Sequence, residues 1–416
     1  MIHPLATGPG RALLDALPPY AADAALALAT RLRAEGHDPE LVTAALAQSR
    51  LRSLAVAKFG AAAASMLFTA DGLEQATRPE LASRHAARFA ETDMRLVHDL
   101  GCGIGSDARA LAAAGVAVRA VDVDPASAAV AAANLATWPT AQVRVGRAEA
   151  VALTAEVGAR HAGAWLDPAR RAQVRDTHGR ARRVFSLEAI EPSWRQVCDI
   201  AAQVPATGAK LSPAFPHAAR PAGAEAQWTS WRGELLECVV WWGPLVRAPG
   251  RSAAVCRPGT VGSYGPGSVG LGTAYVVTEA DLPEAPAAPL TALEQLGPWL
   301  WEADRAVVQA GLTAALPGRE LARGVGLSTA DAPTDGPGLG WARRWPVVEA
   351  MPLRPKLVRG WLRAHDIGRL TIKKRGCTVD PARLAAQLRT TGAGSITLLA
   401  TTIGGQSVAV LLADRA

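Results

Sequence analysis

Cysteine, aromatic residues and long apolar runs are all scarce in this chain of 416 residues. The five cysteines are scattered without a CxxC pair, and His85, His98 and His217 have no ligand-like neighbours in the sequence. We therefore expect structural histidines and no disulfide framework, zinc site or other metal site. No apolar run reaches the about 18 residues of a membrane-spanning helix. The N-terminus lacks the pattern of a secretory signal, so we expect a cytoplasmic protein without a membrane partner.

Acidic residues are scarce at the C-terminal end of the chain. Residues 341–416 contain 13 Lys and Arg against 4 Asp and Glu, a net charge of +9. The whole chain carries +7, so all other residues together sum to −2. Because the basicity belongs to one segment, it favours a polyanionic partner for that segment.

The spacing of apolar residues divides the chain into four parts. Helical spacing dominates residues 1–92, and strands alternate with helices over 93–245. Residues 246–340 form a connecting segment rich in Gly and Pro, with a long helical stretch expected from 291. Residues 341–416 read as strand, helix, strand, helix, strand, strand. The pattern predicts an α/β protein with a mostly parallel, doubly wound sheet covered by helices on both faces.

The stretch LVHDLGCGIGSDARAL, residues 96–111, places three alternating glycines between an apolar run and a helix. The apolar run reads as a short buried strand, and Ser106 is a candidate N-cap for the helix. Gly101, Gly103 and Gly105 allow a sharp turn and a close approach to a ligand, because glycine tolerates positive φ and has no side chain. This arrangement predicts a nucleotide-cofactor site.

The acid before these glycines separates two cofactor classes. The nicotinamide fingerprint GxGxxG would need a third glycine where Ser106 stands, and Asp99 would repel a dinucleotide pyrophosphate. The pattern of Asp99 with three alternating glycines resembles motif I of the class I S-adenosylmethionine methyltransferases. In that family the acid lies near the positively charged methionine ammonium group of the cofactor. The resemblance implies S-adenosylmethionine as the cofactor.

Later residues extend this expected cofactor site. Asp122 ends the second expected strand, where a carboxylate can accept two hydrogen bonds from a ribose diol. Asp124 precedes Pro125 and is expected to cap the next helix. The family holds adenine just after the third strand, which implies Ala148 and Glu149 here.

The sequence Asp167-Pro168-Ala169-Arg170 follows the fourth expected strand and should face the same crevice. Many amino-group methyltransferases have Asp or Asn, two prolines and an aromatic residue at this point. Here the acid and the first proline match, whereas the second proline and the aromatic do not. We take Asp167, Pro168 and Arg170 as candidate catalytic residues, with Asp167 orienting the acceptor group and accepting from it.

The DPAR form also resembles the RNA 5-methyluridine methyltransferases. Those enzymes use a cysteine nucleophile after the fifth strand, where this chain has Lys210, Leu211, Ser212 and Pro213. Carbon methylation through a covalent adduct needs a thiolate, and a serine alkoxide is far harder to form. We therefore expect a nitrogen or oxygen acceptor.

The stretch RLTIKKRG places Arg369, Lys373, Lys374 and Arg375 along a strand closed by Gly376. With the helical lead-in, motif I and DPARR, it makes the chain resemble the bacterial class I S-adenosylmethionine-dependent methyltransferases that carry a C-terminal THUMP-like domain. The resemblance implies a Rossmann-like cofactor domain, a small basic α/β domain and RNA as a partner, because THUMP domains bind structured RNA. These four basic residues are the candidate RNA contacts.

We expect methylation of RNA at a base nitrogen or another acceptor that is not carbon 5. A methyltransferase for a small molecule or a protein is one alternative, and the basic domain would then mediate assembly. A non-catalytic RNA-binding module with a vestigial cofactor fold is the other. The intact glycine loop and Asp122 argue against the second alternative, and nothing in the sequence excludes the first.

Overall fold

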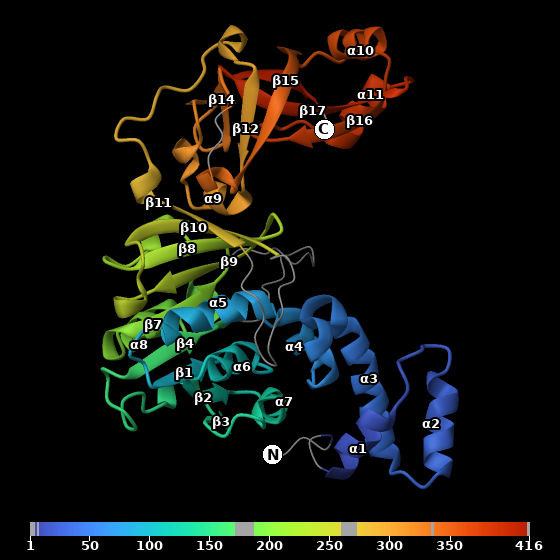
Figure 1. Cartoon of the computed structure of the whole chain (residues 1–416), viewed down its shortest axis with the longest axis vertical. Helices are drawn as coiled ribbons and strands as arrows, with labels where there is room; N and C mark the ends of the chain where they lie inside the picture. Colours follow the sequence, from blue (N-terminus) through green and yellow to red (C-terminus); the bar gives the residue numbers. More distant parts are fainter. Residues whose placement is uncertain (1–4, 6–7, 171–186, 259–272, 334–336, 414–416) are drawn as a thin grey trace.

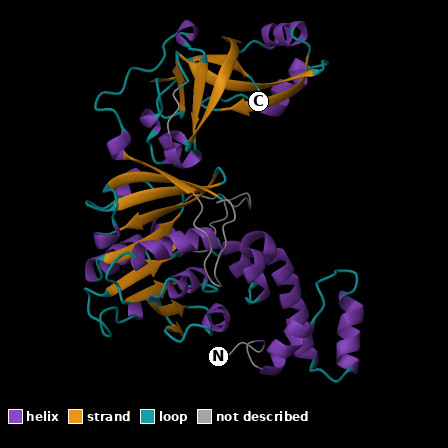
Figure 2. Ribbon diagram, viewed as in Figure 1, coloured by secondary structure: helices purple, strands orange, loops and turns teal. Residues whose placement is uncertain are grey.

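The computed structural model describes residues 5, 8–170, 187–258, 273–333 and 337–413, without the side chains of residues 170, 188 and 337. Figure 1 shows an elongated, curved molecule with helices at the N-terminal end, a helix-covered sheet in the centre and a second sheet at the C-terminal end. In the same view, strands fill the central and C-terminal parts and are absent from the described N-terminal part (Figure 2). No helix of the described residues is long and apolar enough to cross a membrane.

The N-terminal helices share a hydrophobic core with the central part of the molecule. They are α1 (Gly8–Ala16), α2 (Ala25–Ala34), α3 (Pro39–Phe59), α4 (Ala70–Gln75) and α5 (Pro79–Ala90). The longest, α3, begins after Asp38, whose carboxylate accepts a hydrogen bond from the Leu41 amide. Ile104 and Val130 of the central part belong to the core of these helices. The helical region therefore packs directly beside the glycine loop.

The parallel half of the central sheet has the predicted doubly wound topology. Its strands are β1 (Leu96–Leu100), β2 (Ala117–Asp122), β3 (Ala141–Val145), β4 (Ala162–Leu166) and β7 (Ala206–Leu211), in the order β3-β2-β1-β4-β7. The helices α6 (Ser106–Ala113), α7 (Pro125–Leu135) and α8 (Trp194–Gln203) connect them. The chain runs from β1 outward to β3 and then returns to β4 beside β1. A ligand crevice is expected at this reversal, beyond the carboxyl ends of β1 and β4.

The central sheet continues past residue 245, the boundary that we expected for the cofactor domain. Four further strands follow β7: β8 (Glu225–Trp231), β9 (Glu234–Trp241), β10 (Gly250–Arg257) and β11 (Thr273–Thr278). The order is β7-β9-β8-β10-β11, and β9 is antiparallel to both of its neighbours. Strand β8 was not foreseen, because Glu225, Gln227 and Thr229 interrupt the apolar run that marks a buried strand.

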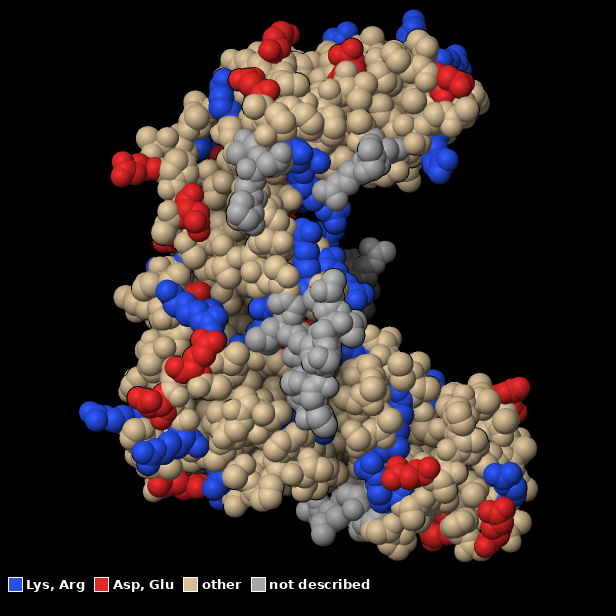
Figure 3. All heavy atoms as spheres, in the orientation of Figure 1, with Lys and Arg blue, Asp and Glu red and all other residues tan. Residues whose placement is uncertain are grey.

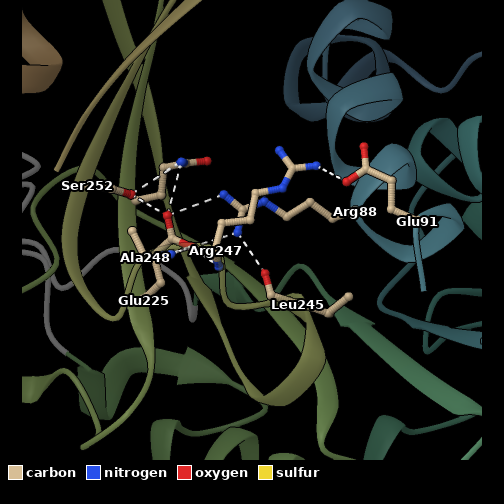
Figure 4. Close-up of polar contacts among 8 residues, drawn as sticks. Arg88, Glu91, Glu225, Leu245, Arg247, Ala248 and Ser252 are labelled. Atoms are coloured by element: carbon tan, nitrogen blue, oxygen red, sulfur yellow. Dashed lines mark hydrogen bonds and ion pairs between the residues drawn. The ribbon is translucent and has the colours of Figure 1, made fainter. Parts of the chain in front are cut away.

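A buried ion pair explains how a carboxylate is accommodated inside β8. Glu225 is 1% exposed and binds Arg88 of α5, with Arg88 Nη1 donating to Glu225 Oε2 at 2.8 Å (Figure 4). Arg88 also donates to the Leu245 carbonyl, and its guanidinium lies 4.5 Å from the Trp241 ring centroid. Ser252 of β10 donates to the same carboxylate. The pair links α5 to the antiparallel half of the sheet.

The C-terminal sheet includes strands from the connecting segment. It contains β12 (Trp299–Ala303), β13 (Arg319–Glu320), β14 (Leu327–Ala330), β15 (Ala342–Pro352), β16 (Ile367–Lys374), β17 (Gly394–Ile403) and β18 (Gln406–Leu412). Its helices are α9 (Arg305–Gln309), α10 (Pro355–Ala364) and α11 (Pro381–Leu388). The element order expected for residues 341–416 is present.

The long helix expected from residue 291 is wrong. Pro298 precedes a strand, β12, which hydrogen-bonds to β14 on one side and β15 on the other. Only the five-residue α9 follows, and it begins after Asp304, whose carboxylate accepts from the Ala306 amide. Pairing on both edges has overridden the helical spacing of this segment.

The C-terminal sheet, in the order β13-β14-β12-β15-β18-β17-β16, is strongly curved. A flat sheet would hold β12 and β16 about 19 Å apart, because four strand spacings separate them. Lys373 of β16 nevertheless reaches Glu302 of β12, with Nζ 2.8 Å from Oε2. The register of β15 shifts between Val347 and Glu349, and such bulges bend a strand. Strand β15 therefore bridges the two arms of the sheet.

Candidate active site

The glycine loop lies between β1 and α6, and each of its three glycines has a positive φ. The φ values are 91° at Gly101, 54° at Gly103 and 82° at Gly105, a region that favours glycine. A Cβ on Gly101 would lie 3.1 Å from the Asp167 carbonyl oxygen, so β4 approaches the loop closely. A Cβ on Gly103 would meet nothing within 4 Å. Gly103 therefore borders open space that a ligand can fill.

Ser106 is not the N-cap of α6, contrary to the sequence interpretation. Gly105 takes that position in a left-handed conformation, and Ser106 is the first helical residue. The Ser106 hydroxyl donates instead to the Thr77 carbonyl at 2.7 Å. This bond fastens the start of α6 to the segment between α4 and α5.

Two carboxylates flank the glycine loop. Asp99 is 1% exposed, and its Oδ2 has no hydrogen-bond partner among the described residues. Burial, together with the nearby carboxylates of Asp107, Asp167 and Asp122, raises the pKa of Asp99 well above its usual range. Asp122 Oδ2 accepts from the Gly103 amide at 2.8 Å, and Asp124 caps α7 as expected. An unpaired buried carboxylate beside open space fits a cationic group such as the ammonium of S-adenosylmethionine.

The residues implied for adenine lie next to Asp122. The Gly146 amide donates to the Asp122 carbonyl at 2.9 Å, and a 3-10 turn, Ala148–Ala150, follows. Ala148 packs partly against the core under β1 and β2. Glu149 pairs with Arg147, with Oε1 2.7 Å from Nε. The structure thus brings both residues to the same sheet edge as the glycine loop.

Asp167 follows β4 directly and is held by Lys210 at the end of β7. Lys210 Nζ lies 2.5 Å from Asp167 Oδ2 and also donates to Thr77 Oγ1 at 2.9 Å. Burial alone would lower the pKa of Lys210, but the carboxylates of Asp167, Asp107 and Glu237 raise it. Lys210 therefore stays charged and keeps a cation against Asp167.

The other two candidate catalytic residues follow Asp167 in the chain. Pro168 is buried, and the backbone of Arg170 lies in a two-residue strand, β5 (Ala169–Arg170), paired with β6 (Ile190–Glu191). The Arg170 side chain lies outside what the structure describes.

A buried histidine and its carboxylates lie beside this edge and were missed as functional neighbours. His85 Nδ1 is 2.8 Å from Asp107 Oδ1, and Nε2 is 2.9 Å from Glu237 Oε1. Burial alone would lower the pKa of His85, but Glu237 and Asp107 raise it to about 9. The ring stacks on Trp165, with centroids 4.4 Å apart. These groups come from separate elements, so no local motif could have indicated them.

Two of the four candidate RNA contacts also make contacts within the protein. Lys373 pairs with Glu302 and lies 4.6 Å from the Trp345 ring centroid. Arg375 donates to the Ala303 and Gly326 carbonyls at 3.0 and 3.2 Å. Arg369 and Lys374 are exposed. The pairing of Lys373 with Glu302 could not be predicted, because Glu302 lies about 70 residues earlier and reaches β16 only through the curvature of the sheet.

Three family models match parts of the chain. They are a methyltransferase domain over residues 98–157, a THUMP domain-like family over residues 342–414 and a domain of unknown function (DUF8688) over residues 1–55. The methyltransferase match includes the glycine loop and the two carboxylates that flank it, Asp99 and Asp122.

Related proteins agree with these matches. Proteins of Mycobacterium tuberculosis strains CDC 1551 and H37Rv, described as uncharacterized S-adenosylmethionine-dependent methyltransferases, are each 30% identical over 353 residues, covering 82% of this chain and 86% of the relative. The crystal structure of a suspected methyltransferase from Porphyromonas gingivalis W83 has the same fold, with a TM-score of 0.70 at 18% identity over 96% of this chain and 100% of that one. This chain belongs to the S-adenosylmethionine-dependent methyltransferases, and S-adenosylmethionine is its cofactor.

Proposed function

We propose that this methyltransferase acts on RNA and methylates a nitrogen of a base. The observation that carries the proposal is the arrangement of Asp167. Lys210 occupies its Oδ2, no described residue hydrogen-bonds to its Oδ1, and the side chain is 34% exposed. Oδ1 is therefore available to accept a hydrogen bond from an N–H of the acceptor, which a base amine or ring nitrogen supplies.

The residues around Asp167 support transfer to such a nitrogen. S-adenosylmethionine supplies an electrophilic methyl group bound to a sulfonium sulfur. The acceptor nitrogen gives the electron pair of the new N–C bond as the S–C bond breaks, and Asp167 receives the N–H proton. Lys210 orients this carboxylate, and the buried Pro168 limits the backbone that carries it. Arg170 is proposed to hold the acceptor strand.

The geometry of the glycine loop and its flanking carboxylates supports a role for each predicted cofactor residue. Asp99 would bind the ammonium group, and Asp122 would accept from the ribose hydroxyls. The backbone of Gly101, Gly103 and Gly105 would line the methionine portion. Ala148 and Glu149 would border adenine, since both follow β3 next to Asp122.

The cysteines near this edge argue against carbon-5 methylation. Cys102 lies in the glycine loop and Cys238 pairs with Leu211 in the sheet, and both are buried. Burial raises the pKa of each thiol well above its usual range, and nearby carboxylates raise it further. Neither cysteine therefore supplies the thiolate that a covalent adduct needs. No stable adduct should form with 5-fluoropyrimidine RNA.

The C-terminal domain supports RNA as the substrate class. The THUMP domain-like match covers residues 342–414, and residues 341–416 carry a net charge of +9 while the remainder of the chain sums to −2. Positive charge on this domain can bind a phosphate backbone, which the carboxylates of the active-site edge would repel. The five free thiols suit the cytoplasm, where we place the reaction.

The test is a comparison of modified nucleosides in RNA from a parent strain and a strain that lacks this gene. We expect one N-methylated nucleoside to disappear, to return with the wild-type gene and to stay absent with Asp167→Ala. Identical nucleoside profiles, with methyl transfer to a protein or a metabolite instead, would exclude RNA as the substrate.

A further inference from the structure

The basic residues of helix α10 are free of internal partners. Lys356, Arg359 and Arg363 lie on α10, and Arg354 precedes it. None of these four side chains has an ion-pair or hydrogen-bond partner among the described residues, in contrast to Lys373 and Arg375. No Asp or Glu occurs between residues 350 and 365. The available positive charge of this region therefore includes α10 and the exposed Arg369 and Lys374 of β16, whereas Lys373 and Arg375 are engaged within the protein.

Three of these cations share one face of the helix. Lys356, Arg359 and Arg363 are spaced by three and four residues, so their side chains project from neighbouring turns of the same stripe. Lys356 and Arg363 are exposed, and Arg359 is half-buried. We call these three residues the α10 basic face. In Figure 3, several Lys and Arg side chains lie, together with some Asp and Glu, at the end of the molecule where Figure 1 places α10.

Helix stability does not account for this arrangement. Like charges three and four residues apart destabilise a helix by a few tenths of a kcal/mol per pair, about 0.2–0.5. Lys356 stands in the first turn, where the helix dipole disfavours a cation. Acidic residues at either point would stabilise α10 better. A ligand with negative charges is the physical reason that remains for keeping three unpaired cations together.

The opposite face of α10 decides between two kinds of anionic surface. Val358 and Leu362 are 0% and 1% exposed and pack in the core under β16 and β17. A helix that binds a membrane surface must bury its apolar face in lipid, and here that face is already occupied. The repeated phosphates of a nucleic acid can be contacted by the cations alone.

We infer that the α10 basic face contacts the phosphate backbone of the RNA substrate, an inference that rests on the proposed function. The half-buried stem of Arg359 limits how far its guanidinium can move, whereas the exposed Lys356 and Arg363 can follow the backbone. The contact positions the RNA without reading its sequence, because phosphates carry no base identity.

The test is filter binding of unfractionated tRNA to the full chain at several salt concentrations. One variant combines Lys356→Gln, Arg359→Gln and Arg363→Gln. The matched control removes the same charge from exposed arginines outside the C-terminal domain, as Arg50→Gln, Arg95→Gln and Arg160→Gln. Three lost phosphate contacts should lower the slope of log K against log salt by about two and weaken binding on the order of 100-fold near ~0.1 M salt. The control should lose far less.

Each outcome has a separate meaning. If the wild type binds no tRNA, the proposed RNA function fails together with this inference. If the wild type binds and the α10 variant matches the control, the α10 inference alone is wrong. Equal loss of binding to polyglutamate and tRNA would make α10 a general polyanion surface and overturn the RNA assignment. Removing like charges should leave the midpoint of thermal unfolding unchanged or raise it slightly, and the single variants Lys356→Gln and Arg363→Gln repeat the test if the triple variant fails to fold.

Discussion

Individual charges at the carboxyl edge of the central sheet determine what the active site accepts. Among the described residues, the carboxyl groups of Asp99, Asp107, Asp122, Asp167 and Glu237 gather there with the two cationic groups Lys210 and His85. Burial raises the pKa of Asp99, so the other four carboxylates supply the negative charge and outnumber the two cations. This excess of negative charge attracts a cationic cofactor and N–H donors. It disfavours phosphate at this edge, so in the proposed RNA complex most of the phosphate backbone should lie elsewhere on the molecule while a single base reaches the edge.

Replacing Asp167 by Asn tests whether this side chain orients and deprotonates the acceptor. The amide keeps the shape but cannot receive the proton, so methyl transfer should fall by about 10²–10⁴-fold. Calorimetric affinity for S-adenosylhomocysteine should change little, because Asp167 faces the acceptor side in this account. Turnover equal to wild type on an identified RNA would contradict the assigned role.

The His85 cluster makes stability depend on pH in a defined direction. The folded-state pKa of about 9 lies above the ordinary 6.5, so the stabilising contribution is complete below about pH 6.5 and is lost as pH rises through 9. The free energy of unfolding should therefore fall between about pH 6 and 10 by up to roughly 3 kcal/mol more than in His85→Gln. Urea titrations at several pH values measure this difference. Parallel pH profiles for both proteins would show that His85 is not charged in the folded state.

At the scale of single residues, the sequence indicated the candidate site residues that belong to a local motif. The glycines, Asp99, Asp122, Asp124 and Asp167 lie at strand ends, where a fixed spacing places them together. Lys210 and His85 could not be assigned, because their partners come from elements far away in the chain. The ion pair between Lys373 and Glu302 could not be predicted for the same reason, since the two residues approach each other only in the folded sheet.

Among the structural elements, the segment before α4 joins the N-terminal helices to the glycine loop. Two amide side chains each bind both backbone groups of one residue in it. Gln48 of α3 binds Phe68 N and O at 3.0 and 2.5 Å, and Asn134 of α7 binds Leu67 N and O at 2.7 and 2.9 Å. Only Asn134 also donates to the Ile104 carbonyl in the glycine loop, at 2.9 Å. Gln48 is therefore a suitable control for a substitution of Asn134.

Gln48→Leu and Asn134→Leu should both destabilise the protein and should differ in cofactor affinity. Gln48→Leu leaves two backbone groups without their side-chain partner and Asn134→Leu leaves three, at about 1–3 kcal/mol per group. Asn134→Leu also releases the glycine loop, so its Kd for S-adenosylhomocysteine should rise about tenfold more, equivalent to ~1.4 kcal/mol. Calorimetry and denaturant unfolding of both variants measure the two effects separately. Equal losses of affinity would mean that Asn134 supports the fold without positioning the loop.

Arg88 tests the link between α5 and the antiparallel strands. Arg88→Ala leaves Glu225 buried without its partner and should cost about 3–5 kcal/mol of unfolding free energy. Arg247→Ala is the control, because its pair with Glu91 is more than half exposed and should contribute at most about 1 kcal/mol (Figure 4). Thermal and urea unfolding compare the two variants. Similar losses of unfolding free energy in the two variants would mean that the buried pair of Arg88 and Glu225 does not stabilise this junction.

The sequence predicted elements well where the apolar pattern was regular. The parallel strands and the elements of the C-terminal domain have one pattern each, alternating or continuous, between clear turns. Strand β8 was missed because a buried arginine neutralises its glutamate, and β12 was mistaken for helix because its two pairing partners lie later in the chain. Both errors concern interactions that exist only in the folded sheet.

Across the whole molecule, the cations proposed to bind RNA and the carboxylates of the proposed active site lie in different parts of the chain. We place the methyl-transfer site at the acidic edge of the central sheet, whereas the C-terminal domain carries the surplus of cations. Figure 1 places that domain at the far end of a curved molecule from the N-terminal helices, with the central sheet between them. An RNA bound at the C-terminal end can thus extend toward the active-site edge.

The most direct test of the central claim is methyl transfer by the purified full-length protein in vitro. The reaction contains S-adenosylmethionine with a deuterated methyl group and RNA from a strain that lacks this gene. Nucleosides are then separated and fragmented by mass spectrometry. We expect the deuterated methyl on a base nitrogen, with none on carbon 5 of a pyrimidine and none with Asp167→Ala. Label on carbon 5, or on protein or metabolites while the RNA stays unlabelled, would contradict it.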